Sequence, residues 1–334
     1  MAQLEISVII PAYQAEDCIG QCVAALAQQS VARESYEVLV VDDGSTDATA
    51  ERARAAGADR VLTVPHGGPS AARNAGIEAA RGTLVLFTDA DCEPSPDWIA
   101  RMTAPLSDPG VTGVKGAYRT RQTALIARLV QLEFEVRYAR MATLPQIDFV
   151  DTYAAAYRRD VLRDYGGFDT AFPIPSAEDV DLSFRLARAG HRLLFAPDAW
   201  VWHRHPPTLK AYLLRKMRFG YWRALLYVRY PDKISGDAHT DPALKTQFAL
   251  AALLGLAGVG ALVWPGALAP ALWWATGVLL AAFLLTTLPF VRWAWPRDRG
   301  VALAWPAVTL ARVYVQGLGL AVGLVRQLGS RESY

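Results

Sequence analysis

Short apolar runs alternate with amphipathic stretches through the first hundred residues. The apolar runs are rich in strand-forming residues and end in turn residues, and they occupy positions 4–10, 36–41, 60–64 and 84–87. The stretches between them have helical spacing, over positions 16–29, 47–56 and 70–80. We expect Ser45 or Thr46 to cap the second helix and Gly82 to end the third. Strand and helix alternating over short connections predict an α/β fold with a parallel sheet flanked by helices.

The pattern becomes less regular after residue 110. Here the sequence predicts strands at 111–119, 148–157 and 191–196, and helices at 122–141 and 182–189. The second helix is opened by Glu178-Asp179-Val180-Asp181, where acidic residues suit a helix N-terminus. A general base at the helix start is the functional alternative. This part predicts the mixed half of the sheet.

The last third of the chain is strongly apolar. No charged residue lies between Lys245 and Arg292, enough for two spans of about 20 residues each. We expect spans at 248–264 and 272–290, joined by 265–270, with Trp264, Trp273 and Trp274 at the far interface. A buried soluble helical hairpin is the alternative.

A third apolar stretch, residues 301–325, is long enough to cross. Crossing would place Arg312 within the membrane at a cost and Arg326 and Arg331 outside. We therefore expect this stretch to lie in the interface or to pack on the hairpin.

Residues 210–233 interleave seven Lys or Arg residues with Tyr, Phe and Trp. Basic and aromatic residues at helical spacing predict an interfacial helix on anionic membrane lipids. A solvated basic helix is the plainer alternative. Nucleic acid is not expected as a partner, because no RNA-binding module accompanies the patch.

Composition narrows the picture further. The 334 residues carry a net charge of only +2, so there is no global polyanion signature. Cys18, Cys22 and Cys92 form neither an even disulfide framework nor a zinc spacing, which favours a reducing cytosol. The N-terminus has no basic region followed by a long apolar one, so we do not expect a signal peptide.

Candidate chemistry begins at Asp89-Ala90-Asp91, directly after the apolar run 84–87. Two carboxylates two residues apart point the same way at the end of a strand, where open α/β sheets bind ligands. Hard oxygen ligands suit Mg²⁺ or Mn²⁺. An acidic turn is the alternative.

Further polar residues follow the neighbouring predicted strands. Asp43, after the second strand, could accept hydrogen bonds from a base or a ribose. Gly67-Gly68 permits close approach of the backbone to a ligand, and Arg73 could pair with a phosphate. His203, at a strand end, is a candidate third metal ligand, with His205 as its rival.

Six motifs in chain order resemble those of family 2 glycosyltransferases with the GT-A fold. They are Ser7-Val8-Ile9-Ile10-Pro11-Ala12-Tyr13, Val41-Asp42-Asp43-Gly44-Ser45-Thr46-Asp47, Ala72-Arg73-Asn74, Asp89-Ala90-Asp91, Gly167-Phe168-Asp169 and Glu178-Asp179. The resemblance covers residues 6 to about 205. It implies inverting transfer from a nucleotide-diphosphate sugar with a divalent metal, and a Rossmann-like, mostly parallel sheet.

The resemblance also implies residue roles. Asp179 would be the catalytic base beside Glu178, and Asp91 would bind the metal with His203. The nucleotide sugar would be held by Pro11, Ala12, Tyr13, Asp43, Arg73, Asp89 and Ala90.

Taken together, these patterns predict a membrane-anchored glycosyltransferase of bacterial type facing the cytoplasm. Its acceptor would be lipid-linked or a glycan, because tethering places such a substrate beside the site. We expect a catalytic domain at 1–207, an interfacial helix and linker at 208–244, and a membrane hairpin with a third segment at 245–334. The alternatives are a catalytically silent nucleotide-sugar-binding subunit, a nucleotidyltransferase and a processive polysaccharide synthase. The synthases usually carry a Gln-x-x-Arg-Trp element, which Lys216-Met217-Arg218-Phe219 does not match.

Overall fold

The computed structural model describes residues 4–172, 174–234, 243–264 and 266–330. The chain forms two compact units. The first comprises residues 1–121 and 137–205, and the second comprises residues 122–136 and 206–334. Residues 235–242, in the predicted linker, and Arg331 lie outside the described residues.

The first unit is built on an eight-stranded sheet in the order β3-β2-β1-β4-β7-β6-β8-β5. The first four strands in the chain, all mutually parallel, are β1 (Ile6–Ala12), β2 (Tyr36–Asp42), β3 (Arg60–Thr63) and β4 (Leu84–Thr88). Their core positions are buried in β1, β2 and β4 because these strands run through the centre of the sheet. The predicted parallel half is therefore confirmed.

The other half of the sheet is mixed, also as predicted. β7 (Ala154–Arg158) runs antiparallel between β4 and β6 (Val111–Arg119). β8 (Arg192–Trp202) is parallel to β6, and the short β5 (Glu93–Pro94) pairs antiparallel with β8.

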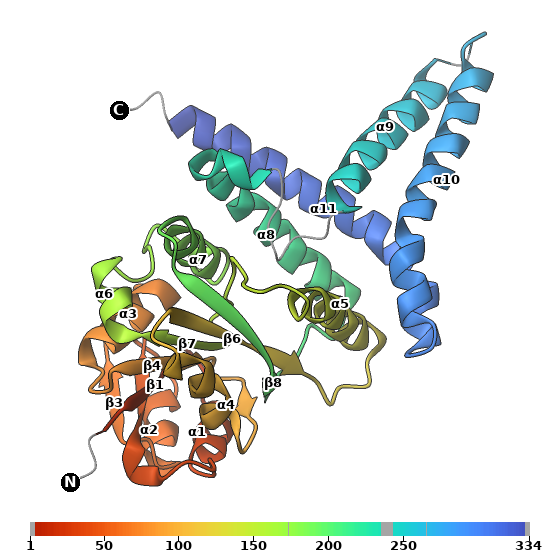
Figure 1. Cartoon of the computed structure of the whole chain (residues 1–334). Helices are drawn as coiled ribbons and strands as arrows, with labels where there is room; N and C mark the ends of the chain where they lie inside the picture. The colour runs from red at the N-terminus through yellow and green to blue at the C-terminus, as the bar shows by residue number, and fades with distance from the viewer. Residues whose placement is uncertain (1–3, 173, 235–242, 265, 331–334) are drawn as a thin grey trace. The chain divides into compact units, whose positions relative to one another are not determined.

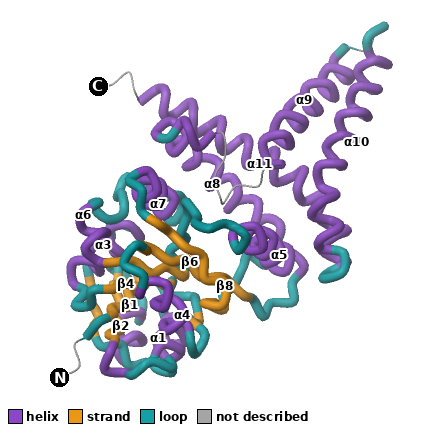
Figure 2. Tube along the Cα trace, viewed as in Figure 1, coloured by secondary structure: helices purple, strands orange, loops and turns teal. Residues whose placement is uncertain are grey.

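Helices surround the strands of this unit (Figures 1 and 2). They are α1 (Ile19–Leu26), α2 (Thr49–Ala55), α3 (Pro69–Ala79), α4 (Trp98–Thr103), α6 (Arg159–Asp164) and α7 (Glu178–Arg188), with short 3₁₀ segments η1 (Arg33–Ser35) and η2 (Ala104–Ser107). The last turn of α5 (Leu125–Met141) also belongs here.

Two strand predictions were wrong in extent. Residues 148–153 are not strand, and β7 begins at Ala154. β8 continues beyond the predicted end at residue 196, because residues 196–199 stand opposite Gly116 in a bulge of the pairing with β6. Pro197 lies in this bulge, where its missing N–H costs no ladder hydrogen bond. The extension carries β8 as far as Trp202, directly before His203.

Both predicted helix ends were also wrong. Neither Ser45 nor Thr46 caps α2, whose N-cap is Ala48. Their hydroxyls instead accept hydrogen bonds from Gln14 N and Gln14 Nε2, at 2.9 and 3.0 Å, tying the loop after β1 to the loop after β2. α3 ends before Gly82, which passes against the backbone of Ile6, where a Cβ would not fit.

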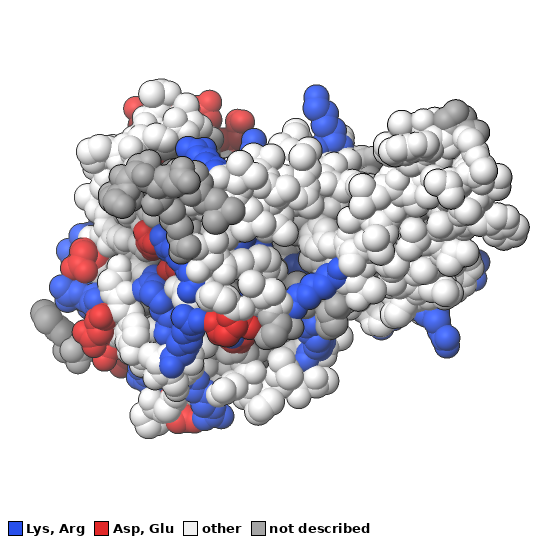
Figure 3. All heavy atoms as spheres, turned by 90° about the horizontal axis from the view of Figure 1, so that it is seen from above, with Lys and Arg blue, Asp and Glu red and all other residues white. Residues whose placement is uncertain are grey.

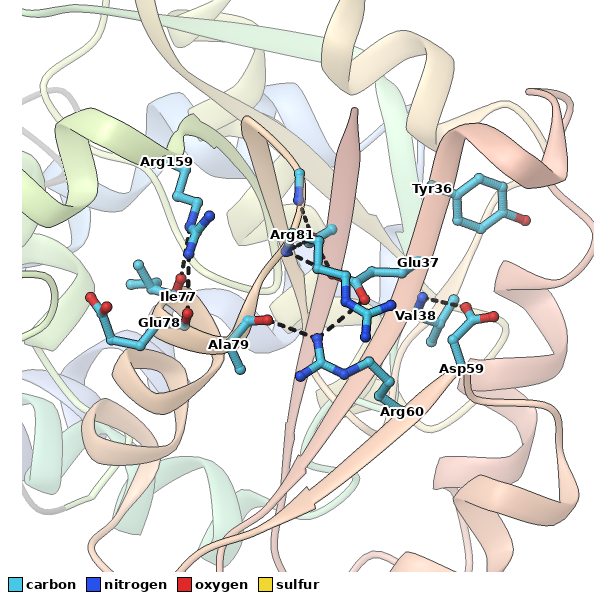
Figure 4. Close-up of polar contacts among 12 residues, drawn as sticks. Tyr36, Glu37, Val38, Asp59, Arg60, Ile77, Glu78, Ala79, Arg81 and Arg159 are labelled. Atoms are coloured by element: carbon cyan, nitrogen blue, oxygen red, sulfur yellow. Dashed lines mark hydrogen bonds and ion pairs between the residues drawn. The ribbon is translucent and has the colours of Figure 1, made fainter. Parts of the chain in front are cut away.

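The C-terminal end of α3 is fixed by two arginines (Figure 4). Arg60 Nη1 donates to Ala79 O at 2.7 Å, and Arg159 donates to Ile77 O and Glu78 O, both at 3.0 Å. Cations suit the last carbonyls of a helix. The anchor holds α3 in place, and Arg73 extends from this same helix.

The second unit is helical. It contains α8 (Leu209–Arg229), η3 (Pro231–Ile234), α9 (Ala243–Val263), α10 (Ala269–Ala294), α11 (Arg299–Ser330) and the first turns of α5. Of the described helices, α9, α10 and most of α11 are long and apolar enough to cross a membrane. Figure 3 shows a broad uncharged surface over this part of the chain.

α8 packs closely along α11 within the second unit. Added Cβ atoms on Gly319 and Gly323 would meet the backbone oxygens of Met217 and Tyr221, so the two helix backbones approach directly. α8 is thus one member of a helix pair, and its contact with anionic lipid stays a prediction.

A buried ionic cluster joins the helices of the second unit. Arg312 of α11 pairs with Glu133 of α5 at 2.8 Å and donates to Gln247 of α9 at 3.1 Å. Lys216 of α8 lies 3.2 Å from the same glutamate. These partners lower the cost of burying Arg312 in apolar surroundings.

Candidate active site

The loop after β4 carries the paired carboxylates predicted from the sequence. Asp89 follows Thr88 directly, and Cys92 N donates to Asp89 O at 3.0 Å, which closes a tight turn around the buried Ala90. The Asp89 side chain is 34% exposed and that of Asp91 is 42% exposed. Both carboxylates are therefore accessible to a ligand.

The end of β8 brings His203 to this loop. His203 Nδ1 lies 3.4 Å from Asp91 Oδ2 and 3.8 Å from Cys92 Sγ. The other ring nitrogen, Nε2, is buried without a hydrogen-bond partner among the described residues. Asp91, Cys92 and His203 form the one group found in the described part of the chain whose ligand atoms are close enough to share a metal ion.

The donor types in this group suit a hard or borderline cation. Burial raises the pKa of the Cys92 thiol well above its usual value, with Asp91 adding to the effect. The Asp91 carboxylate is the donor type that suits Mg²⁺ or Mn²⁺, and the His203 imidazole adds a borderline nitrogen donor. His205, the rival ligand, is buried with its ring nearly perpendicular to that of Tyr118, with centroids 5.5 Å apart.

Arg73 connects this loop to α7. Its Nη1 donates to Glu178 Oε1 at 2.8 Å and its Nη2 to Asp89 Oδ1 at 3.3 Å. The side chains of Arg73 and Glu178 are only 4% and 3% exposed. The sequence predicted a phosphate partner for Arg73, whereas the structure pairs it with two carboxylates.

Asp179 lies in the first turn of α7, beside this ion pair. Its Oδ1 accepts a hydrogen bond from Val180 N at 2.8 Å, and the residue is half-buried. Burial, followed by the nearby Glu178 carboxylate, raises the pKa of Asp179 to about 7. A carboxyl group titrating near neutrality is suited to take up a proton in a reaction.

Two of the sequence motifs bind each other. Asn74 Nδ2 donates to Phe168 O and Phe168 N donates to Asn74 Oδ1, both at 2.8 Å. Gly167 adopts a φ of 64°, in the left-handed region that favours glycine. These contacts anchor the segment that precedes α7 onto α3, and they help to place Glu178 near Arg73.

At the ends of β1 and β2, Asp43 is a structural centre. Its two carboxylate oxygens accept from Gly67 N at 2.8 Å and Gly68 N at 2.9 Å, and the residue is buried. Asp43 N donates to Ala12 O at 2.8 Å. Asp43 therefore orders the glycine loop before α3, while its predicted contact with a nucleotide stays a prediction.

An exposed ring pair stands beside Asp43. The Tyr13 ring, 49% exposed, stacks on His66 with centroids 4.2 Å apart, and His66 Nδ1 lies 2.9 Å from Asp43 Oδ2. Pro11, in β1, is partly exposed next to Ala12. The sequence alone did not predict a role for His66 in the site. Its position directly before Gly67-Gly68 was the available signal.

A buried polar cluster between β6 and the segment before β7 was also missed. Lys115 Nζ pairs with Asp151 and donates to Tyr153 Oη at 3.2 Å, inside a ring of aromatic side chains. Burial lowers the pKa of Lys115 well below its usual value, against the opposing effect of Asp179. A lysine in the middle of the predicted strand 111–119 was the sequence signal.

The comparisons with known proteins agree with this arrangement. The family described as "Glycosyltransferase like family 2" matches residues 2–221. The chain is 32% identical over 273 residues to the pre-mycofactocin glycosyltransferase of Mycobacterium tuberculosis, covering 78% of this chain and 55% of that protein. It spans about half the length of that relative.

Two further similar proteins are covered over more of their own length. The glycosyltransferase AglE of Haloferax volcanii is 31% identical over 235 residues, covering 69% of this chain and 76% of that protein. The mannosyltransferase PcManGT of Pyrobaculum calidifontis, solved with GDP-Man and Mn²⁺, has a TM-score of 0.58 at 21% identity and covers 94% of this chain and 87% of that one. This structure shows a shared GT-A fold.

The family match spans the whole β1-to-β8 sheet and both carboxylate motifs, so the chain belongs to glycosyltransferase family 2.

Proposed function

We propose that this protein is an inverting glycosyltransferase. It transfers a sugar from a nucleotide-diphosphate sugar to a lipid-linked or glycan acceptor at the cytoplasmic face of a membrane. The observation that carries the proposal is the Arg73 bridge. It joins Asp89, two residues before Asp91, to Glu178, directly before Asp179. One buried side chain therefore holds both Asp89, near the proposed metal ligand, and Glu178, next to the proposed base.

The reaction needs one group to accept a proton and others to hold the leaving group. Asp179 takes the proton from the acceptor hydroxyl while the acceptor oxygen forms a bond to the anomeric carbon. The bond from that carbon to the diphosphate breaks, and its electron pair leaves with the nucleoside diphosphate. Attack from the face opposite the leaving group inverts the anomeric centre.

Asp91 and His203 would hold the divalent ion, which neutralises charge on the diphosphate when bound. The Pyrobaculum mannosyltransferase, with the same fold, was solved with Mn²⁺ and a nucleotide sugar. Tyr13 and His66 offer exposed rings on which a base could stack, next to the loop that Asp43 orders. Arg73 keeps Asp89 and Glu178 in place rather than meeting the phosphates directly.

The proposal of a membrane-bound acceptor is based on the helices of the second unit. Three of its described helices are long and apolar enough to span a membrane. A membrane anchor would confine the catalytic unit to the surface where a lipid-linked acceptor is concentrated.

The test is metal-dependent release of nucleoside diphosphate from nucleotide sugars by the full-length protein in detergent. Nucleotide sugars are first screened by thermal shift with Mn²⁺. Asp179→Asn should lower turnover by about 10²–10⁴-fold, the usual contribution of a general base, with donor binding little changed.

Asp160→Asn is the matched control. Asp160 is exposed in the first turn of α6, and its Oδ1 accepts from the next residue's N–H at 2.8 Å, as Asp179 does in α7. Turnover should be unaffected in this variant. No hydrolysis with any donor would favour a silent nucleotide-sugar-binding subunit, and release of pyrophosphate would favour a nucleotidyltransferase.

A further inference from the structure

The candidate metal ligand His203 belongs to a stack of aromatic rings. Its ring lies nearly parallel to that of Tyr118, with centroids 4.3 Å apart and an interplanar angle of 19°. Tyr118 in turn lies parallel to Tyr153, with centroids 3.3 Å apart and an angle of 14°. Two parallel rings cannot share one face of Tyr118, so Tyr118 is held between Tyr153 and His203.

The far side of the stack is fixed by hydrogen bonds. Tyr153 Oη lies 2.7 Å from Tyr138 Oη and accepts from Lys115 Nζ at 3.2 Å. Tyr138 Oη also accepts from the backbone N of Tyr118 at 2.8 Å. Each of these residues is at least nine-tenths buried. Their positions are therefore set by packing and by polar contacts together.

The near side of the stack differs from the usual support of a metal-bound histidine. Such histidines generally donate their second ring N–H to a carboxylate, a carbonyl or water, which fixes the ring plane. His203 faces Asp91 and Cys92 with Nδ1, while Nε2 has no hydrogen-bond partner among the described residues. The ring instead stacks on that of Tyr118.

We propose that Tyr118 is a positioning residue that orients the His203 ring toward the divalent ion, with Tyr153 and Lys115 supporting it from behind. This inference rests on the proposed metal site. Stacking replaces the second-nitrogen hydrogen bond as the element that fixes the ring. The same arrangement distinguishes the two histidines, because the Tyr118 ring is nearly parallel to that of His203 and nearly perpendicular, at 88°, to that of His205.

The test is direct binding of Mn²⁺ alone to the full-length protein in detergent, followed by the electron paramagnetic resonance signal of free Mn²⁺. Tyr118→Leu should weaken Mn²⁺ binding by about 10–100-fold, the range found when the support of a metal ligand is lost. Tyr118→Phe, which keeps the ring, should bind within about 2-fold of wild type if stacking is the main support. Thermal unfolding of each variant reports folding separately.

A double variant isolates the route of the effect. In the His203→Ala background, Tyr118→Leu should cause no further loss of Mn²⁺ affinity, because the ligand that it orients is gone. An equal loss in both backgrounds would overturn the positioning role. If Tyr118→Leu does not fold, Tyr118→Met fills the space with a flexible unbranched chain and carries the same expectation.

Failure of this inference differs from failure of the proposed function. If wild type binds Mn²⁺ and Tyr118→Leu binds it with equal affinity, the positioning role of Tyr118 is wrong, while the proposed metal site is retained. No Mn²⁺ binding by wild type, even with a nucleotide-sugar donor that stabilises it, would overturn both.

Discussion

At the scale of single residues, the candidate site depends on buried charges that neutralise one another. Arg73 is almost fully buried between Glu178 and Asp89, and Glu178 also accepts from Ser176 N at 2.8 Å. A buried ion pair adds little net stability, but removal of one partner leaves the other uncompensated. The residues around Asp179 are therefore held in place by an ion pair whose disruption would cost considerable free energy.

Loss of Arg73 should destabilise the protein more than loss of an exposed arginine. Arg73→Ala leaves Glu178 as an unpaired buried charge, so we expect a loss of about 3–5 kcal/mol in the free energy of unfolding. Arg163→Ala, which breaks the exposed pair with Glu78 at 2.9 Å, should cost about 0–1 kcal/mol. Thermal unfolding of both variants in one detergent measures the difference.

The double variant Arg73→Met with Glu178→Leu tests the reason. Removing both charges should recover much of the loss, because apolar residues can replace a buried pair. An Arg73→Ala variant as stable as Arg163→Ala would contradict the burial argument.

The raised pKa of Asp179 sets a pH dependence for turnover. A base must be ionised to accept a proton, and the folded protein keeps Asp179 protonated below about pH 7. Turnover at saturating donor should therefore fall as the pH is lowered through 7. The residual turnover of Asp179→Asn should show no inflection near pH 7. A wild-type rate that does not change between pH 5, about two units below this pKa, and pH 8 would contradict the assignment.

At the scale of elements, the sequence predicted what local pattern controls. β1, β2 and β4 are mostly apolar runs because both faces are buried, and each run ends in turn residues. The predicted strand ended at residue 196 because a proline such as Pro197 normally ends a strand. β8 continues through a bulge opposite Gly116, and this bulge depends on pairing with β6, which is distant in the sequence. Asp91 and Asp179 stood out as motif residues. Tyr118, Tyr153 and His66 did not, since their importance comes from contacts with other segments.

Gly82 shows the same dependence on a distant element. An added Cβ would lie 2.6 Å from the carbonyl carbon of Ile6, in β1. Because the obstacle is backbone rather than a flexible side chain, we expect Gly82→Ala to destabilise the protein by about 1–3 kcal/mol.

Gly20→Ala is the matched control for this substitution. Gly20 lies in α1, and a Cβ there would meet nothing within 4 Å. Alanine is favoured over glycine in a helix, so this variant should gain about 0.5–1 kcal/mol. The two thermal unfolding midpoints should move in opposite directions, and a shared direction would show that the contact at β1 is not limiting.

At the scale of the whole molecule, the question is which parts of the second unit lie within the membrane. α9 and α10 expose large apolar side chains along their lengths, including Leu256, Val278 and Leu285. α11 differs because its C-terminal half packs on α8 at Gly319 and Gly323, and Arg326 donates to Tyr221 Oη at 2.8 Å. α8 carries six Lys or Arg residues between Leu209 and Arg229. Such a helix does not enter the hydrocarbon core cheaply.

Single cysteines should report this topology in intact cells or sealed vesicles. With the catalytic unit in the cytoplasm, Leu268→Cys, before α10, should react with an impermeant maleimide added outside. Arg297→Cys, between α10 and α11, should react only after the membrane is opened. Cys22 and Cys92 are buried, and Cys18→Ala removes the partly exposed one.

Val325→Cys then decides the path of α11. Val325 is 72% exposed, near the end of the stretch that packs on α8. Because the basic α8 must remain at the membrane surface, this end of α11 should stay with it, and Val325→Cys should react like Arg297→Cys. Reaction from outside, like Leu268→Cys, would mean that α11 crosses. In that case α8 would have to accompany it, and the burial of Arg312 against Glu133 would become the means by which a charged helix pair enters the membrane.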